Sequence, residues 1–297
     1  MSKGFAIVTD STSNLPTPML EEKGISVIPI TFSFDGEEHC CLDTTEFSGG
    51  KGDMYYKRLK EGARVTTSQV SPQQYIDVFE PILKMGEDII FVGMSSGISG
   101  SYNSAELAAA QMREAYPERK LRIVDTLAAS LGEGKAVLRA VECREKGMSL
   151  DETADLIESE RQSLYQVAML DDLMFLHKGG RISAPKALLG TLLGIRPILK
   201  GNKEGRLVLC GKTKGRKRGL EVLADAYRKL VDRLKDQLVC IAYTDCPEDA
   251  YTLRDMLEAI WKPKGFLIER YEPVTGSYAG PGTVALFFEG CDGVRNM

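Results

Sequence analysis

The chain has 297 residues, with 38 Lys and Arg against 42 Asp and Glu, which leaves a formal net charge of −4. This near balance argues against a protein that binds nucleic acid over its whole surface. The chain has only two histidines, which argues against a multi-histidine metal centre. Because domains are typically about 100–200 residues long, the length favours two domains.

The sequence also indicates where the protein works. Its seven cysteines are odd in number and form no C-x-x-C pair, which favours reduced thiols. The apolar run near the N-terminus (residues 5–9) is too short for a signal peptide. The longest nearly apolar stretch, at 187–195, is well below the roughly 20 residues of a membrane span. We therefore expect a cytoplasmic protein with no membrane span.

The first half alternates strand-like and helix-like segments. Apolar residues at helical spacing predict a helix over 72–85, and Ser149 with Glu152 predicts a capping box at the start of another. In chain order we expect strands at 5–9, 25–34, 88–94 and 121–125, and helices at 18–23, 72–85, 102–116, 130–146 and 148–162. Repeated strand–helix units form a parallel sheet with helices on both faces. Residues 1–160 are thus predicted to form a three-layer α/β domain.

The pattern changes near residue 163, and residues 161–297 are predicted to form a second, mixed α/β domain. The expected strands are 165–170, 196–200, 206–212, 238–244, 265–271 and 283–289. The expected helices are 173–176, 184–193, 218–234 and 248–261, with glycine-rich loops at 177–183 and 276–282.

Two polar segments of the first half have both a binding and a structural interpretation. Asp10, Ser11 and Thr12 follow the first strand, where open α/β sheets bind ligands, but the two hydroxyls can equally cap the next helix. Residues 65–69 (VTTSQ) offer three hydroxyls and an amide to an anion, or to their own loop backbone.

The segment 94–101 (MSSGISGS) is more informative. A buried strand runs into a loop with two glycines and four serines, and a helix follows. Glycines let backbone N–H groups converge, and a helix N-terminus carries partial positive charge, so this geometry suits a carboxylate or phosphate. It is not a Walker A sequence, and a serine-rich helix cap is the structural alternative.

The second half supplies the basic residues. Arg181, after a pair of glycines, can hold a carboxylate, a phosphate or a structural aspartate. Between Lys200 and Arg218, eight Lys or Arg stand against only Glu204. Such a run is a solvated surface or a docking site for an acidic partner. With no G-x-S-x-G, no metal-ligand spacing and no histidine beside a candidate nucleophile, the pattern favours binding over hydrolysis.

Several of these segments occur together, and in the same order, in the DegV family. They are 8–12 (VTDST), 67–69 (TSQ), 95–102 (SSGISGSY), 124–126 (VDT) with 129–134 (ASLGEG), 178–183 (KGGRIS) and 280–282 (GPG). From residue 5 to about 288 the chain resembles this family. The resemblance implies a bacterial two-domain α/β protein that binds one long-chain fatty acid between its domains. Some family members are the binding subunit of a fatty acid kinase and present the carboxylate to a separate ATP-using subunit, which makes an acyl-phosphate.

The resemblance also assigns residues. It implies that Thr67 and Ser99 hold the carboxylate, with Ser96 close by and Arg181 near the headgroup. The family often has His-x-Gly-Pro-Gly near its C-terminus, and Tyr278 stands here at the histidine position. A tyrosine hydroxyl can donate one hydrogen bond to a carboxylate, so binding is expected. Whether this chain, with tyrosine in place of the histidine, supports phosphoryl transfer as a histidine-bearing member would is a separate question.

The sequence therefore predicts a fatty-acid carrier that is not itself an enzyme and has no cofactor besides its bound ligand. The candidate docking residues for a kinase subunit lie in the basic run, at Lys212, Lys214, Arg216, Lys217 and Arg218. The alternatives are a stand-alone phosphotransferase or hydrolase that uses the loop 95–101, and a regulatory protein that signals through a partner.

Overall fold

A computed structural model describes residues 4–182, 194–234 and 236–296. In the first half, four strands form an entirely parallel sheet in the order β2-β1-β6-β7. They are β1 (Ala6–Asp10), β2 (Ile25–Ile28), β6 (Ile89–Gly93) and β7 (Leu121–Asp125). The central strands are buried almost throughout, as expected for a parallel sheet covered on both faces. The predicted parallel sheet is confirmed.

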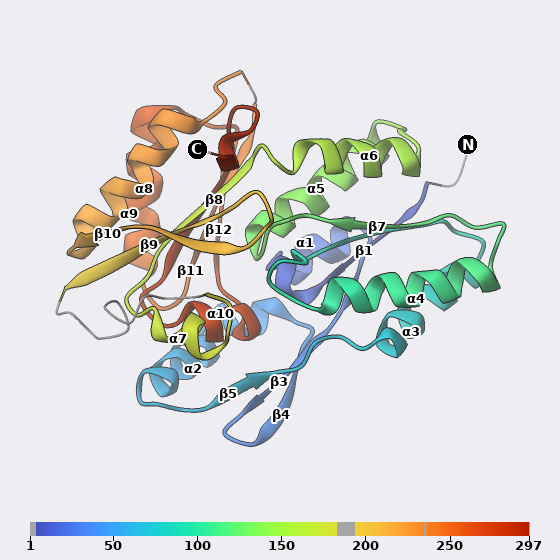
Figure 1. Ribbon diagram of the computed structural model, residues 1–297, viewed down its shortest axis with the longest axis horizontal. Helices are drawn as coiled ribbons and strands as arrows, with labels where there is room; N and C mark the ends of the chain where they lie inside the picture. Colours follow the sequence, from blue (N-terminus) through green and yellow to red (C-terminus); the bar gives the residue numbers. More distant parts are fainter. Residues whose placement is uncertain (1–3, 183–193, 235, 297) are drawn as a thin grey trace.

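Helices cover both faces of this sheet. They are α1 (Thr17–Glu22), α3 (Pro72–Lys84), α4 (Ser101–Ala115), α5 (Leu131–Glu145) and α6 (Leu150–Glu160). Figure 1 shows α3 and α4 on one side of β1 and β7, and α5 and α6 on the other. The capping box of Ser149 and Glu152 is present at the start of α6. The three-layer arrangement is therefore confirmed.

The second half forms a six-stranded mixed sheet in the order β10-β9-β8-β13-β11-β12, in which only β11 and β12 pair in parallel. Its strands are β8 (Leu164–Met169), β9 (Ile195–Gly201), β10 (Leu207–Lys214), β11 (Leu238–Tyr243), β12 (Gly265–Arg270) and β13 (Val284–Glu289). Helices α8 (Arg216–Leu230) and α9 (Pro247–Ile260) pack on each other and on this sheet, while α5 contacts β8, β11 and β13. The chain is thus an α/β protein with one parallel and one mixed sheet.

One expected strand is two strands in the structure. The single strand predicted over 25–34 is wrong, because β2 ends at Ile28 and β3 (Ile30–Phe34) belongs to a separate antiparallel sheet with β4 (Glu37–Cys41) and β5 (Val65–Thr67). Pro29 stands between them and has no N–H to donate to a sheet. Helix α2 (Gly50–Lys60) lies between β4 and β5 in the chain, and the sequence analysis did not predict it.

Two short helices, α7 (Met174–Lys178) and α10 (Pro273–Ala279), pack against each other. The loop predicted over 276–282 is therefore wrong in its first part, because α10 continues through Ala279. Glu272 caps this helix by accepting hydrogen bonds from the backbone N–H groups of Val274 and Thr275. Among the described residues, single-turn 3-10 helices also lie at Ser11–Ser13, Thr44–Phe47 and Val294–Asn296. The helix predicted over 184–193 lies outside the described residues.

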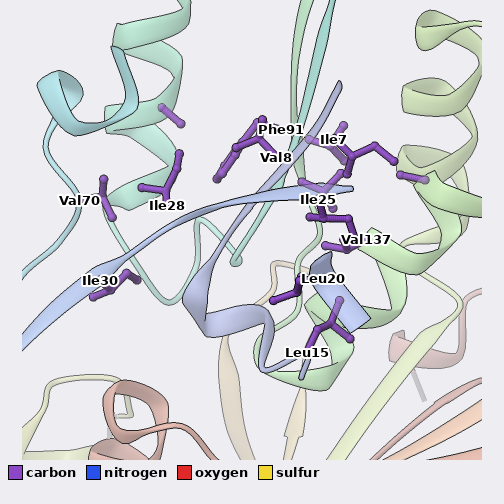
Figure 2. Close-up of a cluster of buried hydrophobic side chains, with 14 of the residues drawn as sticks. Ile7, Val8, Leu15, Leu20, Ile25, Ile28, Ile30, Val70, Phe91 and Val137 are labelled. Atoms are coloured by element: carbon purple, nitrogen blue, oxygen red, sulfur yellow. The ribbon is translucent and has the colours of Figure 1, made fainter. Parts of the chain in front are cut away.

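The largest apolar core reaches from the parallel sheet to the mixed sheet. Figure 2 shows part of it, with Val8 and Phe91 of the parallel sheet beside each other and Val137 of α5 elsewhere in the same cluster. The same cluster includes Ala242 and Phe287 of the mixed sheet. The two sheets thus share a core, and the boundary expected near residue 160 stays a prediction. In the part of the chain that the structure describes, no helix is long and apolar enough to cross a membrane.

Candidate functional site

A cavity lies between the two sheets, with an empty volume of about 960 Å³ including its open mouth. Much of its lining is apolar and comes from both halves of the chain: Ile30, Met94, Ile98, Ala129, Val167, Ala168, Leu170, Leu176, Leu199, Leu207, Val274, Ala279, Ala285 and Phe287. The lining suits a ligand with a large apolar part.

Small side chains of the mixed sheet make room for this cavity. Ala168 of β8 pairs with Leu199 of β9 on one side and with Ala285 of β13 on the other. Ala285 in turn pairs with Ala242 of β11. Because paired residues in a sheet direct their side chains to the same face, these alanines leave a trough in the sheet surface.

The polar end of the cavity brings three predicted residues together. The hydroxyl oxygens of Thr67 and Tyr278 lie 2.6 Å apart. The guanidinium carbon of Arg181 lies 4.7 Å from the centroid of the Tyr278 ring, a cation–π contact. Its Nη1 also donates to the carbonyl of Gly179 at 2.7 Å. All three side chains line the cavity, so two hydroxyls and one cation meet at one end of an apolar space.

The two glycines before Arg181 have separate roles. A Cβ on Gly179 would lie 2.4 Å from the Tyr278 ring, so only glycine lets the ring pack there. Gly180 has a φ of +72°, which L residues with a side chain rarely adopt. Together they place Arg181 over the ring of Tyr278.

Ser99 lines the cavity next to the segment that carries Thr67. Its hydroxyl bonds to that of Ser101 at 3.0 Å, and Ser101 accepts from the backbone N–H of Val70 at 3.3 Å. Gln69 donates to Ser104 at 3.0 Å, and a Cβ on Gly100 would lie 2.4 Å from the Gln69 amide oxygen. Hydrogen bonds and close packing therefore hold the segments 67–70 and 99–104 together, which places the TSQ motif beside the serine–glycine loop.

Comparison with known proteins agrees with this geometry. A family model described as "Uncharacterised protein, DegV family" matches residues 4–290. The chain belongs to the DegV family. A DegV domain-containing protein of Clostridium perfringens is 36% identical over 97% of this chain and 98% of its own length.

Solved DegV structures share the whole fold. One is a DegV family protein from Thermus thermophilus, for which fatty acid binding is described. It is 31% identical to this chain, with a TM-score of 0.84 over 97% of this chain and 100% of that one. A fatty acid binding DegV family protein from Streptococcus agalactiae is 25% identical, with a TM-score of 0.81 over 98% of this chain and 100% of that one. These likenesses extend over both halves of the chain.

Ser96, unlike the other predicted DegV site residues, does not line the cavity. Its side chain is exposed, and its backbone N–H donates to Asp125 at 3.2 Å. Its neighbour Ser95 is buried and donates to the carbonyl of Gly205 at 2.9 Å, which holds the loop against the turn between β9 and β10. Among the described residues, no hydrogen bond joins a serine hydroxyl of 95–101 to a histidine or a carboxylate. The loop thus shows no base that would activate a nucleophile.

Asp10 and Thr12 of the first DegV motif pair with a buried acid that the sequence analysis did not single out. Thr9 and Thr12 each donate to the Glu133 carboxylate at 3.2 Å, and Asp10 accepts from the backbone N–H of Thr12 at 2.9 Å. Burial raises the pKa of both Asp10 and Glu133. Only Thr12 of residues 10–12 reaches the cavity lining, so this segment is largely structural.

A second unpredicted group connects the first motif to α10. The backbone N–H of Glu272 donates to the Asn14 side chain at 2.7 Å, and Asn14 donates back to the carbonyl of Arg270 at 3.1 Å. Asn14 has a φ of 58°, a left-handed conformation that asparagine tolerates. Burial raises the pKa of Glu272 to about 7. Because α10 carries Tyr278, this contact fixes the part of the cavity wall where Tyr278 meets Thr67.

Arg216 of the predicted docking residues is engaged inside the protein. Its guanidinium contacts the carboxylates of Asp171 and Asp249 and donates to the carbonyl of Gly282 at 3.0 Å. A Cβ on Gly282 would lie 2.3 Å from Asp171, so this glycine also needs to lack a side chain. Arg216 therefore holds the Gly-Pro-Gly loop that follows α10. The remaining docking candidates are exposed: Lys212, Lys214, Lys217 and Arg218.

Arg216→Ala is expected to lower the free energy of unfolding by about 1–2 kcal/mol, because it removes the cation of the partly buried Asp249 and leaves Asp171 with Arg196 alone. Urea unfolding at neutral pH measures this. Lys217→Ala, one residue away and exposed, is the matched control and should stay within about 0.5 kcal/mol of the native chain. Equal effects of the two substitutions would contradict a structural role for Arg216.

Proposed function

We propose that this DegV family protein binds one long-chain fatty acid. The acyl chain occupies the cavity between the sheets, and the carboxylate lies at Thr67, Ser99, Arg181 and Tyr278. The observation that carries the proposal is the cavity itself, which is mostly apolar and has hydroxyls and a guanidinium gathered at one end. The fatty acid binding of the Thermus thermophilus relative supports it.

The energetics favour this orientation of the ligand. Each buried methylene contributes about 0.8 kcal/mol, so the alanine trough accounts for much of the affinity. A desolvated carboxylate must keep its hydrogen bonds, since losing them is costly. The hydroxyls of Thr67 and Tyr278 are 2.6 Å apart, close enough for one carboxylate to accept from both, while Arg181 supplies the opposite charge.

The protein acts as a carrier and does not turn over its ligand. Its acyl group is presented to a separate kinase subunit, which docks on the exposed cations of β10 and the start of α8: Lys212, Lys214, Lys217 and Arg218. The hydroxyl of Ser95 already donates a hydrogen bond to the carbonyl of Gly205. This structural bond supports a binding role, and not a nucleophilic one, for the loop 95–101.

Thr67→Val tests the headgroup assignment, since valine keeps the shape of threonine and removes its hydroxyl. A hydrogen bond to a charged group is worth about 2 kcal/mol, so the affinity for stearic acid should fall roughly thirtyfold. Ser99→Ala should act in the same direction, and Ser96→Ala, whose side chain is exposed, should leave the affinity unchanged. Titration calorimetry on delipidated protein measures all three. Equal losses in Ser96→Ala and Thr67→Val would contradict the assignment.

A further inference from the structure

Gln166 is a buried amide on β8 whose side chain lines the cavity. Its side chain is only 4% exposed. The amide oxygen accepts a hydrogen bond from the backbone N–H of Ala129 at 3.3 Å, which fixes the orientation of the amide. The amide nitrogen is buried and has no hydrogen-bond partner among the described residues. One donor in the cavity wall is therefore unused by the protein.

The neighbours of Gln166 leave space for this nitrogen. Gly201 of β9 lies beside it, and a Cβ at that position would be 2.2 Å from the Gln166 nitrogen. On the other side Gln166 pairs with Phe287 of β13, which closes the trough of alanines at this end. A glycine at 201 thus permits the amide to stand at the wall of the cavity.

The position of Gln166 along its strand separates it from the carboxylate. Leu170, four residues further along the chain, belongs to the apolar cluster against which Tyr278 packs. At about 3.3 Å per residue, Gln166 is roughly 13 Å from this end. A group of the ligand that reaches Gln166 is therefore far along the acyl chain.

A plain acyl chain brings only methylene groups to this donor and leaves it unpaired, whereas a ligand oxygen would gain a hydrogen bond there. We propose that the preferred ligand is an oxygenated long-chain fatty acid, whose mid-chain or distal hydroxyl or keto oxygen accepts a hydrogen bond from Gln166. This inference rests on the proposed fatty-acid function and names the class of fatty acid that the cavity selects.

The test is competition for delipidated protein between matched acids: stearic, 2-hydroxystearic, 10-hydroxystearic, 12-hydroxystearic and 12-oxostearic acid. At least one of the 10- and 12-substituted acids should bind about tenfold more tightly than stearic acid, and 2-hydroxystearic acid should gain nothing. Gln166→Leu should abolish this preference, because the substitution removes the donor that distinguishes an oxygenated acid from stearic acid. Gln73→Leu, the same substitution on the exposed face of α3, is the matched control and should keep the preference.

The outcomes separate the two proposals. If stearic acid binds and none of the oxygenated acids binds better, or if Gln166→Leu keeps the preference, the inference is overturned while the fatty-acid function stands. If no fatty acid binds at all, the proposed function fails and the inference fails with it. Gly201→Ala gives a second variant, because its Cβ must displace the amide and should also abolish the preference. The competition among these acids on the native chain tests the preference directly and does not depend on any variant.

Discussion

Ala168→Leu is expected to reduce the affinity for stearic acid roughly a hundredfold. Ala168 belongs to the trough and lines the cavity, so the larger side chain takes the place of about three to four methylene groups of the ligand, worth about 3 kcal/mol in burial. Fluorescence displacement on delipidated protein measures the loss. This is the largest effect on binding that we expect from one substitution.

Chain length provides the control for this substitution. At about 3.3 Å per residue, Ala168 lies roughly 7 Å along β8 from the end at Leu170 and Tyr278, so a very short acid such as butyric acid ends before it, and its weaker affinity should change little in Ala168→Leu. Because overpacking also destabilises a protein by about 1–3 kcal/mol, the melting temperature of the ligand-free variant should be measured alongside. An equal loss for short and long acids would show that the substitution disturbs the headgroup end, and would contradict a channel that passes Ala168.

Glu272→Gln is expected to remove a loss of stability that the native chain undergoes between about pH 4.5 and pH 7. Burial raises the pKa of Glu272 from 4.5 to about 7. In this window the unfolded chain has released the proton that the folded chain still holds, so stability falls as the pH rises. The shift corresponds to about 3 kcal/mol at pH 7 and above. Urea unfolding at several pH values measures the slope.

Three other acids have a raised pKa and contribute to the same slope. Burial raises the pKa of Asp10, Glu133 and Glu269, so they add slopes of the same sign, and the difference between Glu272→Gln and the native chain reports Glu272. Asp151→Asn is the control, because Lys120 and Arg122 lower the pKa of this half-exposed carboxylate, and it should not flatten the slope. Parallel pH profiles for Glu272→Gln and the native chain would contradict the account.

Much of the fold could be predicted because its elements carry local signals. The capping box at Ser149 and the apolar spacing of Tyr75, Phe79 and Ile82 lie within single helices, and both helices occur as expected. The two sheets followed from the order of these elements. The break at Pro29 could also have been found, since a proline inside an expected central strand argues against that strand.

The missed elements lacked such signals. Helix α10 contains glycine, threonine and serine, which favour helix weakly, and it forms because Glu272 caps it and Asn14 holds Glu272 from far away in the sequence. Tyr55 and Tyr56 of α2 likewise donate to the carbonyls of Pro273 and Tyr271, contacts that no local pattern indicates. Long-range contacts override propensity at these positions.

The candidate site also contains residues that the sequence could identify and residues that it could not. Thr67, Ser99, Arg181 and Tyr278 could be named because they belong to short motifs that resemble a family, and the structure places all four at the cavity. Ser96 belongs to the same motif but is exposed. Gln166 belongs to no motif, and neither its burial nor its unused donor can be deduced without the pairing of β8 with its neighbours.

The central claim is that one fatty acid occupies the cavity between the sheets. Native mass spectrometry of delipidated protein, titrated with stearic acid, tests it most directly. The account predicts that one acid binds per chain, and that this bound form is lost in Ala168→Leu at the same concentrations. No bound acid, or several acids per chain at equal abundance in the native protein and in Ala168→Leu, would contradict it.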